Sequence, residues 1–203
     1  MNKKILAELL THSQNHLETI TPEYIKKTFE VELHDKFDRL EDYVEAIDNL
    51  VLDRYFSKHW QADMKKWKYS GVQLIDEVNA LKPRAVLDVG CGYNEFKGKI
   101  KNLTGIDPYN VHADWKIHLK DYRTKIKYDV ILCLGSINFG SRSKIESEIE
   151  MCVNLLEKDG VIFFRVNPGV QHDKPEARWI EFFAWNVPFI IEMSEKFGLK
   201  ILD

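Results

Sequence analysis

A glycine pair that directly follows a short apolar run constrains the fold of this chain more than any other feature of its sequence. The apolar run at residues 85–89 is followed by Gly90 and Gly92. Such a run directly before glycines predicts a strand that is buried on both faces of a parallel sheet. The glycines allow a tight turn and let a ligand approach the backbone. Fifteen residues after Gly92, Asp107 stands at the tip of a second apolar run. Because parallel strands present their carboxyl ends at one sheet edge, we expect both features to share a ligand site.

Apolar patterns along the rest of the chain predict alternating strands and helices. The predicted strands span residues 85–89, 103–106, 130–134 and 161–166, with a weaker one at 115–119. The predicted helices span residues 37–56, 72–81, 143–156 and 188–197. An earlier helix is expected to start at Thr21-Pro22, and Asp159-Gly160 is expected to stop the helix at 143–156. The expected fold class is therefore α/β: a Rossmann-like, mostly parallel sheet with flanking helices, plus a helical N-terminal extension.

Composition and charge narrow the class of protein. A hydrophobic fraction of 44% suits a globular core, and a net charge of -3 provides no electrostatic footprint for DNA binding. The three scattered cysteines, Cys91, Cys133 and Cys152, fit no disulfide framework and indicate reduced thiols. The N-terminal apolar run is interrupted by Glu8, and no apolar run approaches the ~20 residues of a membrane span. We therefore expect a cytoplasmic protein without a membrane partner.

The glycine turn also separates two kinds of nucleotide-like ligand. The dinucleotide fingerprint G-x-G-x-x-G would need glycine at position 95, where this chain has Glu95. A carboxylate there would face a pyrophosphate unfavourably, and the sequence lacks the phosphate-binding G-x-x-x-x-G-K-[ST] loop. S-adenosylmethionine has an adenosine, a sulfonium and an amino-acid end but no phosphate. An acidic turn is compatible with that ligand, and Asp107 is placed to accept hydrogen bonds from its ribose hydroxyls.

Several motifs in sequence order resemble one enzyme family. Asp88-Val89-Gly90-Cys91-Gly92 followed by Asp107 resembles motifs I and II of the class I S-adenosylmethionine-dependent methyltransferases. The resemblance covers residues 70–203, and its later parts are residues 120–122, 128–136, 155–164 and 185–203. The third glycine of the family pattern is Asn94 here, and asparagine tolerates positive φ better than most residues.

The resemblance implies a site for S-adenosylmethionine. Its residues would be Asp88, Gly90, Cys91, Gly92, Asp107, Pro108, Asp121, Tyr122 and Ser136. Asp107 would bind the ribose hydroxyls, and Asp88 would orient the glycine loop and the amino-acid end of the cofactor. Asp121 would accept from the adenine amino group, the Tyr122 N–H would meet the ring, and backbone groups near Ser136 would meet the ammonium end. The resemblance also divides the chain into a helical extension or lid, 1–70, and a Rossmann-like methyltransferase domain, 71–203.

Catalysis requires little of such a protein beyond positioning, because a sulfonium is already an activated methyl donor. A base is needed only when the acceptor is protonated at neutral pH. His172 follows the predicted strand at 161–166 and is the candidate catalytic base, since histidine titrates near neutrality; the alternative is a solvated loop histidine. No metal site is expected, because the histidines are dispersed and the pair His12 and His16 lacks acidic neighbours.

The expected function is methyl transfer from S-adenosylmethionine to an unidentified acceptor, with a small molecule or sugar favoured by the near-neutral charge. One alternative is a catalytically silent, methyltransferase-like binding module. Another is an RNA-directed methyltransferase, since the lysine-rich stretches 97–101 and 116–127 could bind RNA. The family usually adds a seventh, antiparallel strand, and the chain stops at Asp203 before it. Two explanations are open: the sequence is truncated, or this member leaves a sheet edge uncovered. Residues 134–140 resemble small methyltransferases of marine phages, which would place the protein in the host cytoplasm.

Overall fold

The computed structural model describes residues 1–14, 16–60, 71–170 and 174–202, and the chain forms two compact units. The helical unit comprises Met1–Trp60, Phe139–Arg142 and Gly169–Phe183. The sheet unit comprises the described parts of Gln61–Asn138, Ser143–Pro168 and Ala184–Asp203. The expected domain boundary at residue 70 lies outside the described residues and stays a prediction. The helical unit also takes in two later segments that the sequence analysis did not assign to it.

Amphipathic helices build the core of the helical unit. Its helices are α1 (Lys3–Ser13), η1 (Leu17–Thr19), α2 (Pro22–Phe29), α3 (Leu40–Arg54), the π-helical turn η2 (Tyr55–His59) and η4 (Pro175–Ala177). The Thr21 hydroxyl accepts from the Tyr24 N–H at 3.2 Å, which confirms the expected start of α2. Ile47 of α3 is buried in one cluster with Trp179 from the later segment. In the described ranges, no helix has the length and apolar character needed to cross a membrane.

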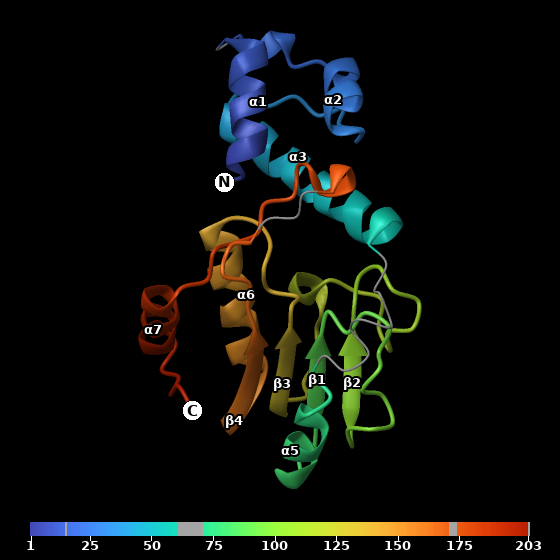
Figure 1. Ribbon diagram of the computed structural model, residues 1–203, viewed down its shortest axis with the longest axis vertical. Helices are drawn as coiled ribbons and strands as arrows, with labels where there is room; N and C mark the ends of the chain where they lie inside the picture. Colours follow the sequence, from blue (N-terminus) through green and yellow to red (C-terminus); the bar gives the residue numbers. More distant parts are fainter. Residues whose placement is uncertain (15, 61–70, 171–173, 203) are drawn as a thin grey trace. The chain divides into compact units, whose positions relative to one another are not determined.

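Four parallel strands form the centre of the sheet unit, in the order β2-β1-β3-β4 (Figure 1). They are β1 (Val86–Val89), β2 (Leu103–Ile106), β3 (Tyr128–Leu134) and β4 (Leu156–Arg165). This arrangement confirms the expected Rossmann-like α/β class. The weaker strand predicted at 115–119 was wrong: Trp115 makes an isolated parallel bridge to Ile106, and Leu119–Asp121 is the 3-10 turn η3. Because Trp115 is 60% exposed, this segment lacks the burial that would hold a further strand.

Helices cover both faces of the sheet. They are α5 (Leu74–Ala80), α6 (Arg142–Leu155) and α7 (Val187–Lys196). Leu132 of β3 belongs to one buried cluster with Val78 of α5. The next residue, Cys133, lies on the other face, where its sulfur is 3.8 Å from that of Cys152 on α6. Alternate residues of β3 therefore pack against different helices, as a strand buried on both faces requires.

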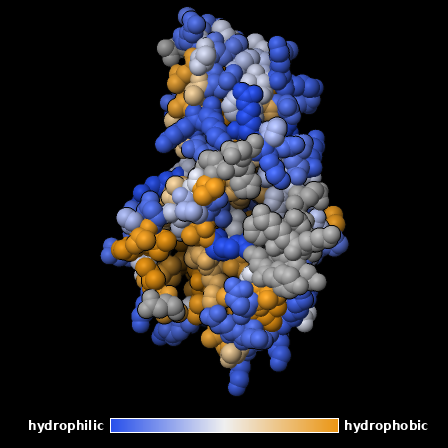
Figure 2. Space-filling view, in the orientation of Figure 1, coloured by the Kyte–Doolittle hydropathy of each residue, from blue (hydrophilic) through white to orange (hydrophobic). Residues whose placement is uncertain are grey.

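The end of α6 differs from expectation. The helix ends at Leu155, and Asp159 and Gly160, which were expected to stop it, lie inside β4. Asp159 adopts φ 63 within an irregular stretch of the β3–β4 pairing, so the strand absorbs the turn residue as a bulge. Within the described residues β4 has a strand neighbour on one side only. Figure 2 shows hydrophobic residues near α7 and β4, where Val187 and Ile191 are exposed.

The connections of the sheet define a switch point between β1 and β3. From β1 the chain passes to β2 on one side, whereas from β2 it returns across β1 to β3 and continues to β4. In open parallel sheets, ligands bind beyond the carboxyl ends of the strands at such a reversal. The segments that follow Val89 of β1 and Leu134 of β3 are therefore the candidate ligand site.

Candidate functional site

The glycine turn after β1 closes against the loop after β3. Gly90 has φ +68, and its N–H and that of Cys91 donate to the Ile106 carbonyl at 2.8 and 3.1 Å. A Cβ at Gly90 would lie 2.4 Å from the Ser136 Cβ. A side chain at position 90 would therefore be strained in its backbone and would collide with Ser136. This contact brings two predicted site residues together at the switch point.

The turn continues through Asn94 and does not lead into a helix. Asn94 adopts φ 56, which confirms that it can replace the third glycine of the family pattern. Its buried side chain donates from Nδ2 to the His112 carbonyl at 3.0 Å. Residues 90–102, all of them described, contain no α-helix. Dinucleotide-binding folds hold the pyrophosphate at a helix N-terminus in this place, so the turn lacks that phosphate site.

Asp107 ties the tip of β2 to the glycine turn. Its Oδ2 accepts from the Gly92 N–H at 3.1 Å, and its Oδ1 accepts from the Tyr109 and Asn110 N–H groups, each at 2.8 Å. The predicted pair of Gly92 and Asp107 is therefore in direct contact. Since a carboxylate oxygen can accept two hydrogen bonds, Oδ2 can take one more, whereas Oδ1 would have to release a backbone donor. Pro108, the next residue, is half-buried.

Asp88 places a buried carboxyl beside this turn. The residue lies on β1 and is 3% exposed. Burial raises the pKa of Asp88 to about 7, and the negative charge of Asp107 adds to the effect. The described part of the chain gives this carboxyl no hydrogen-bond partner. Burial and the same acids also raise the pKa of the half-buried Cys91 thiol, which is therefore protonated at neutral pH.

Ser136 adds a second buried polar group to the switch point. Its Oγ is buried and makes no hydrogen bond to any described residue. Buried polar atoms are nearly always paired in folded proteins, so a partner from a ligand would satisfy both this hydroxyl and the Asp88 carboxyl. A ligand that suits them carries hydrogen-bond donors and a positive charge.

Asp121 and Tyr122, the expected adenine-binding residues, lie in the connection from β2 to β3. Asp121 is exposed at η3, and the Tyr122 hydroxyl lies 2.7 Å from that of Tyr128. The Tyr122 N–H, expected to meet the ring, donates to the His118 carbonyl at 3.1 Å. The link to the rest of the site is indirect: the His118 ring meets the Tyr109 ring edge-on, with centroids 5.6 Å apart.

The sequence analysis missed a polar frame that joins the loops after β3 and β4. Asn138 is 5% exposed, and its Oδ1 accepts from the Asn167 N–H at 2.9 Å. Its Nδ2 donates to the Arg165 carbonyl at 3.4 Å, and the Arg165 guanidinium donates to the Leu134 carbonyl at 2.6 Å. Asn138 falls within the noted stretch 134–140, but no sequence pattern indicates that its amide spans two loops.

His172 lies outside the described residues, so its role stays a prediction. Among the residues that the structure describes, no three His, Cys, Asp or Glu side chains gather to hold a metal ion.

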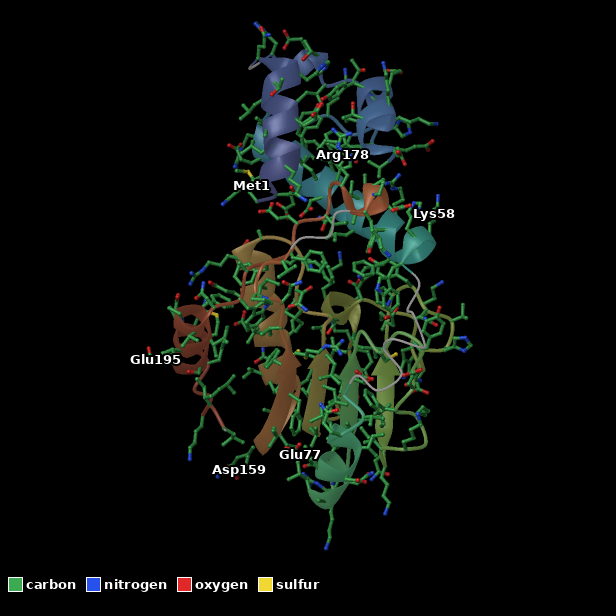
Figure 3. The ribbon with its side chains drawn as sticks, viewed as in Figure 1. Met1, Lys58, Glu77, Asp159, Arg178 and Glu195 are labelled. Atoms are coloured by element: carbon green, nitrogen blue, oxygen red, sulfur yellow. The ribbon has the colours of Figure 1, made fainter. Side chains whose placement is uncertain are left out.

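A hollow of about 320 Å³ lies at the opposite end of the sheet unit from the glycine turn. It is lined by Leu81, Lys82, Pro83, Arg84, Asp129, Val130, Asp159 and Val161. Figure 3 shows Asp159 at the lower end of β4, at the amino ends of the strands. Its charged wall includes an ion pair of 2.7 Å between Arg84 and Asp129. The hollow is therefore separate from the switch point and its predicted site residues.

Comparisons with known proteins give a match at the level of structure. No family model and no curated protein matches the sequence. Among solved structures, the fold resembles 1,6-didemethyltoxoflavin-N1-methyltransferase of Burkholderia thailandensis, with a TM-score of 0.54, 13% identity, and 85% of each chain covered. It also resembles a SAM-dependent methyltransferase of Leishmania major, with a TM-score of 0.52, 13% identity, and 75% of this chain and 73% of that chain covered.

Two further matches extend the set. An O-methyltransferase family protein of Burkholderia thailandensis matches with a TM-score of 0.51 at 13% identity, over 98% of this chain and 67% of that one. The match to DesVI of Streptomyces venezuelae has a TM-score of 0.39 at 16% identity, and covers 62% of this chain and 57% of that chain's length. The three matches with TM-scores above 0.5 show that the chain has the Rossmann-like fold found in these methyltransferases.

Proposed function

We propose that this protein transfers a methyl group from S-adenosylmethionine to a small-molecule acceptor. The observation that carries the proposal is the pair of buried polar groups, the Asp88 carboxyl and the Ser136 hydroxyl, beside a glycine turn at which a Cβ on Gly90 would collide with Ser136. They lie at the switch point of a parallel sheet, the usual ligand site of such folds.

The residues at the switch point suit the parts of this cofactor. Asp88 would face the ammonium of the amino-acid end, which supplies the positive charge and the donors that the carboxyl lacks. Gly90, Cys91 and Gly92 would form the backbone cradle. Asp107, followed by Pro108, would bind the ribose through the remaining acceptor position on Oδ2.

The other proposed cofactor contacts need rearrangement or carry less support. The Ser136 hydroxyl oxygen would accept a hydrogen bond from the ammonium of the cofactor. Asp121 is exposed and free to turn towards an adenine amino group. The Tyr122 N–H would have to leave the His118 carbonyl to meet the ring. We retain both as proposed adenine residues on the basis of their place in the motif order.

The main task of the protein in this reaction is to position the acceptor relative to the methyl donor. When bound, S-adenosylmethionine supplies a methyl group that is activated by its sulfonium. The frame of Asn138 fixes the loops after β3 and β4 relative to each other, which would keep an acceptor in line with the donor. His172 remains the proposed base for an acceptor that needs one, with a solvated loop residue as the alternative.

A small-molecule acceptor is favoured over RNA. One structural neighbour was solved with bound 1,6-didemethyltoxoflavin and S-adenosylhomocysteine. A small-molecule acceptor is therefore compatible with this fold. The net charge of -3 gives the chain no overall attraction to polyanions.

The test is a turnover assay with the full chain, S-adenosylmethionine and a panel of phenols, enols, amines and sugars. We expect S-adenosylhomocysteine to form with at least one member of the panel above the rate without acceptor. Gly90→Ala is the matched negative variant, since its Cβ would meet Ser136. Tight cofactor binding without turnover across the panel would instead identify a catalytically silent binding module.

A further inference from the structure

Arg165 is a cationic side chain at the sheet edge where the proposed cofactor site lies. It is the last residue of β4, and its Nη2 donates to the carbonyl of Leu134, the last residue of β3, at 2.6 Å. The guanidinium therefore reaches from one strand end to the next. It brings a positive charge to the start of the loop that carries Ser136.

Gly135 has no side chain, and the Arg165 guanidinium lies close to the position that a side chain there would take. This glycine has φ +106, and a Cβ on it would lie 3.1 Å from the Arg165 Nη2. A side chain at position 135 would therefore be strained and would press on the guanidinium. The next residue is Ser136, against which Gly90 closes. The guanidinium thus lies one residue away from the contact that marks the proposed cofactor site.

Backbone anchors on both sides hold this arrangement in place. Asn138 donates to the Arg165 carbonyl and accepts from the Asn167 N–H. Trp185 donates from its indole N–H to the Ile137 carbonyl and from its backbone N–H to the Asn167 carbonyl, each at 3.0 Å. A group whose supporting loops are fixed in this way loses little entropy when it binds a ligand.

Arg165 keeps its charge in this setting. Arg165 is exposed as a residue, and partial desolvation of its guanidinium lowers its pKa, but a guanidinium stays protonated in proteins at neutral pH. A cation that is partly removed from water attracts an anion and repels a second cation more strongly than one in bulk solvent. The acids at the site, Asp88 and Asp107, belong to the proposed cofactor contacts.

We propose that Arg165 selects the chemical class of the methyl acceptor: an anionic oxygen nucleophile such as a phenolate, an enolate or a carboxylate, and not a protonated amine. The inference rests on the methyl-transfer function proposed above. A phenol would lose its proton to solvent on binding, because the guanidinium stabilises the oxyanion. In the transfer, an oxygen lone pair forms the O–CH3 bond while the electron pair of the broken S–CH3 bond stays on sulfur. No proton has to be removed in that step.

The test measures binding of 4-nitrophenol, whose absorbance distinguishes phenol from phenolate, with and without S-adenosylhomocysteine. We expect the wild-type chain to bind the phenolate and to lower the pKa of the bound probe. We expect 4-nitroaniline, a neutral probe of similar shape, to bind at least tenfold more weakly, since a hydrogen bond to a charged group is worth about this factor or more. Arg165→Gln should weaken phenolate binding about tenfold or more, and Arg165→Lys should restore part of it.

Arg123→Gln is the matched control, because Arg123 lies in the connection from β2 to β3 and donates to the Lys120 carbonyl at 2.6 Å. It should bind the phenolate like the wild type. The affinity for S-adenosylhomocysteine should stay within about threefold in all three variants, because the proposed cofactor contacts remain intact.

Three results would overturn the inference. The first is a failure of Arg165 to matter for the phenolate: Arg165→Gln binds it as tightly as the wild type does, or the wild type does not bind it at all. The second is binding of 4-nitroaniline as tight as that of the phenolate. The third is a tenfold loss of S-adenosylhomocysteine affinity in Arg165→Gln, which would assign the guanidinium to the cofactor's own carboxylate. Phenolate binding through Arg165 without any binding of S-adenosylhomocysteine would instead refute the proposed cofactor and leave the anion-binding role of Arg165 intact.

Discussion

Replacement of Asp88 by asparagine should change how the stability of the protein depends on pH. In the folded chain, burial first and the charge of Asp107 second raise the pKa of Asp88 to about 7 from its ordinary value of 3.8. A folded-state pKa above the unfolded one means that the ionised carboxyl destabilises the fold. This cost is absent below about pH 4, grows as the pH rises through the interval between the two pKa values, and is complete above about pH 7.

The size of the effect follows from the same two values. A difference of about three pKa units at about 1.4 kcal/mol per unit corresponds to at most roughly 4 kcal/mol, and relaxation or water entry would reduce it to about 2–4 kcal/mol. Asparagine keeps the shape of the side chain but cannot ionise. Between pH 8 and pH 4, the stability of Asp88→Asn relative to the wild type should therefore fall by about this amount, whatever constant offset the new amide adds.

The assay is urea unfolding of wild type and variant at several values between pH 4 and pH 8. Asp129→Asn is the control, because the hydrogen bond and charge of Arg84 lower the pKa of Asp129. The stabilisation from that carboxylate is lost only as the pH falls below its unfolded pKa of about 4, so the stability difference between Asp129→Asn and the wild type should stay nearly constant from pH 4 to pH 8. If the stability difference between Asp88→Asn and the wild type does not change with pH, Asp88 is not a buried ionisable group of the kind described here.

Three further substitutions test individual residues of the site. Gly90→Ala should lower the free energy of unfolding by about 1–3 kcal/mol and weaken S-adenosylhomocysteine binding measured by calorimetry; Gly98→Ala, with φ +78 but no atom within 4 Å of its Cβ, should show the backbone strain alone. Asp107→Ala should weaken binding of the same ligand by about 1–3 kcal/mol and also destabilise the turn, because three backbone N–H groups lose their acceptor; an unchanged dissociation constant would remove Asp107 from the site. For an acceptor hydroxyl that stays protonated when bound, such as that of a sugar, His172→Ala should reduce turnover by about 10²–10⁴-fold; a rate within about threefold of the wild type would identify a loop residue and leave positioning as the source of catalysis.

Sequence reasoning worked best where local chemistry decides the structure. The run before Gly90 became β1, and Gly92 and Asp107 are in contact because two neighbouring parallel strands end at one edge. Asn94 took the positive φ of the missing glycine, as its short polar side chain permits.

The failures arose where tertiary context overrode local preference. Residues 115–119 have strand-like composition, but an exposed Trp115 gives them little to bury and they form one bridge only. Asp159-Gly160 resembles a helix stop, yet the residues are absorbed by β4. The frame around Asn138 depends on contacts between loops 27 to 29 positions apart, which no periodicity in the sequence can reveal.

The most direct test of the proposed cofactor is calorimetric titration of the full chain with S-adenosylhomocysteine and, separately, with NAD. The buried Asp88 carboxyl, the Ser136 hydroxyl and the helix-free glycine turn predict micromolar binding of S-adenosylhomocysteine and no detectable binding of NAD. Binding of NAD in preference to S-adenosylhomocysteine, or no binding of either, would contradict the account.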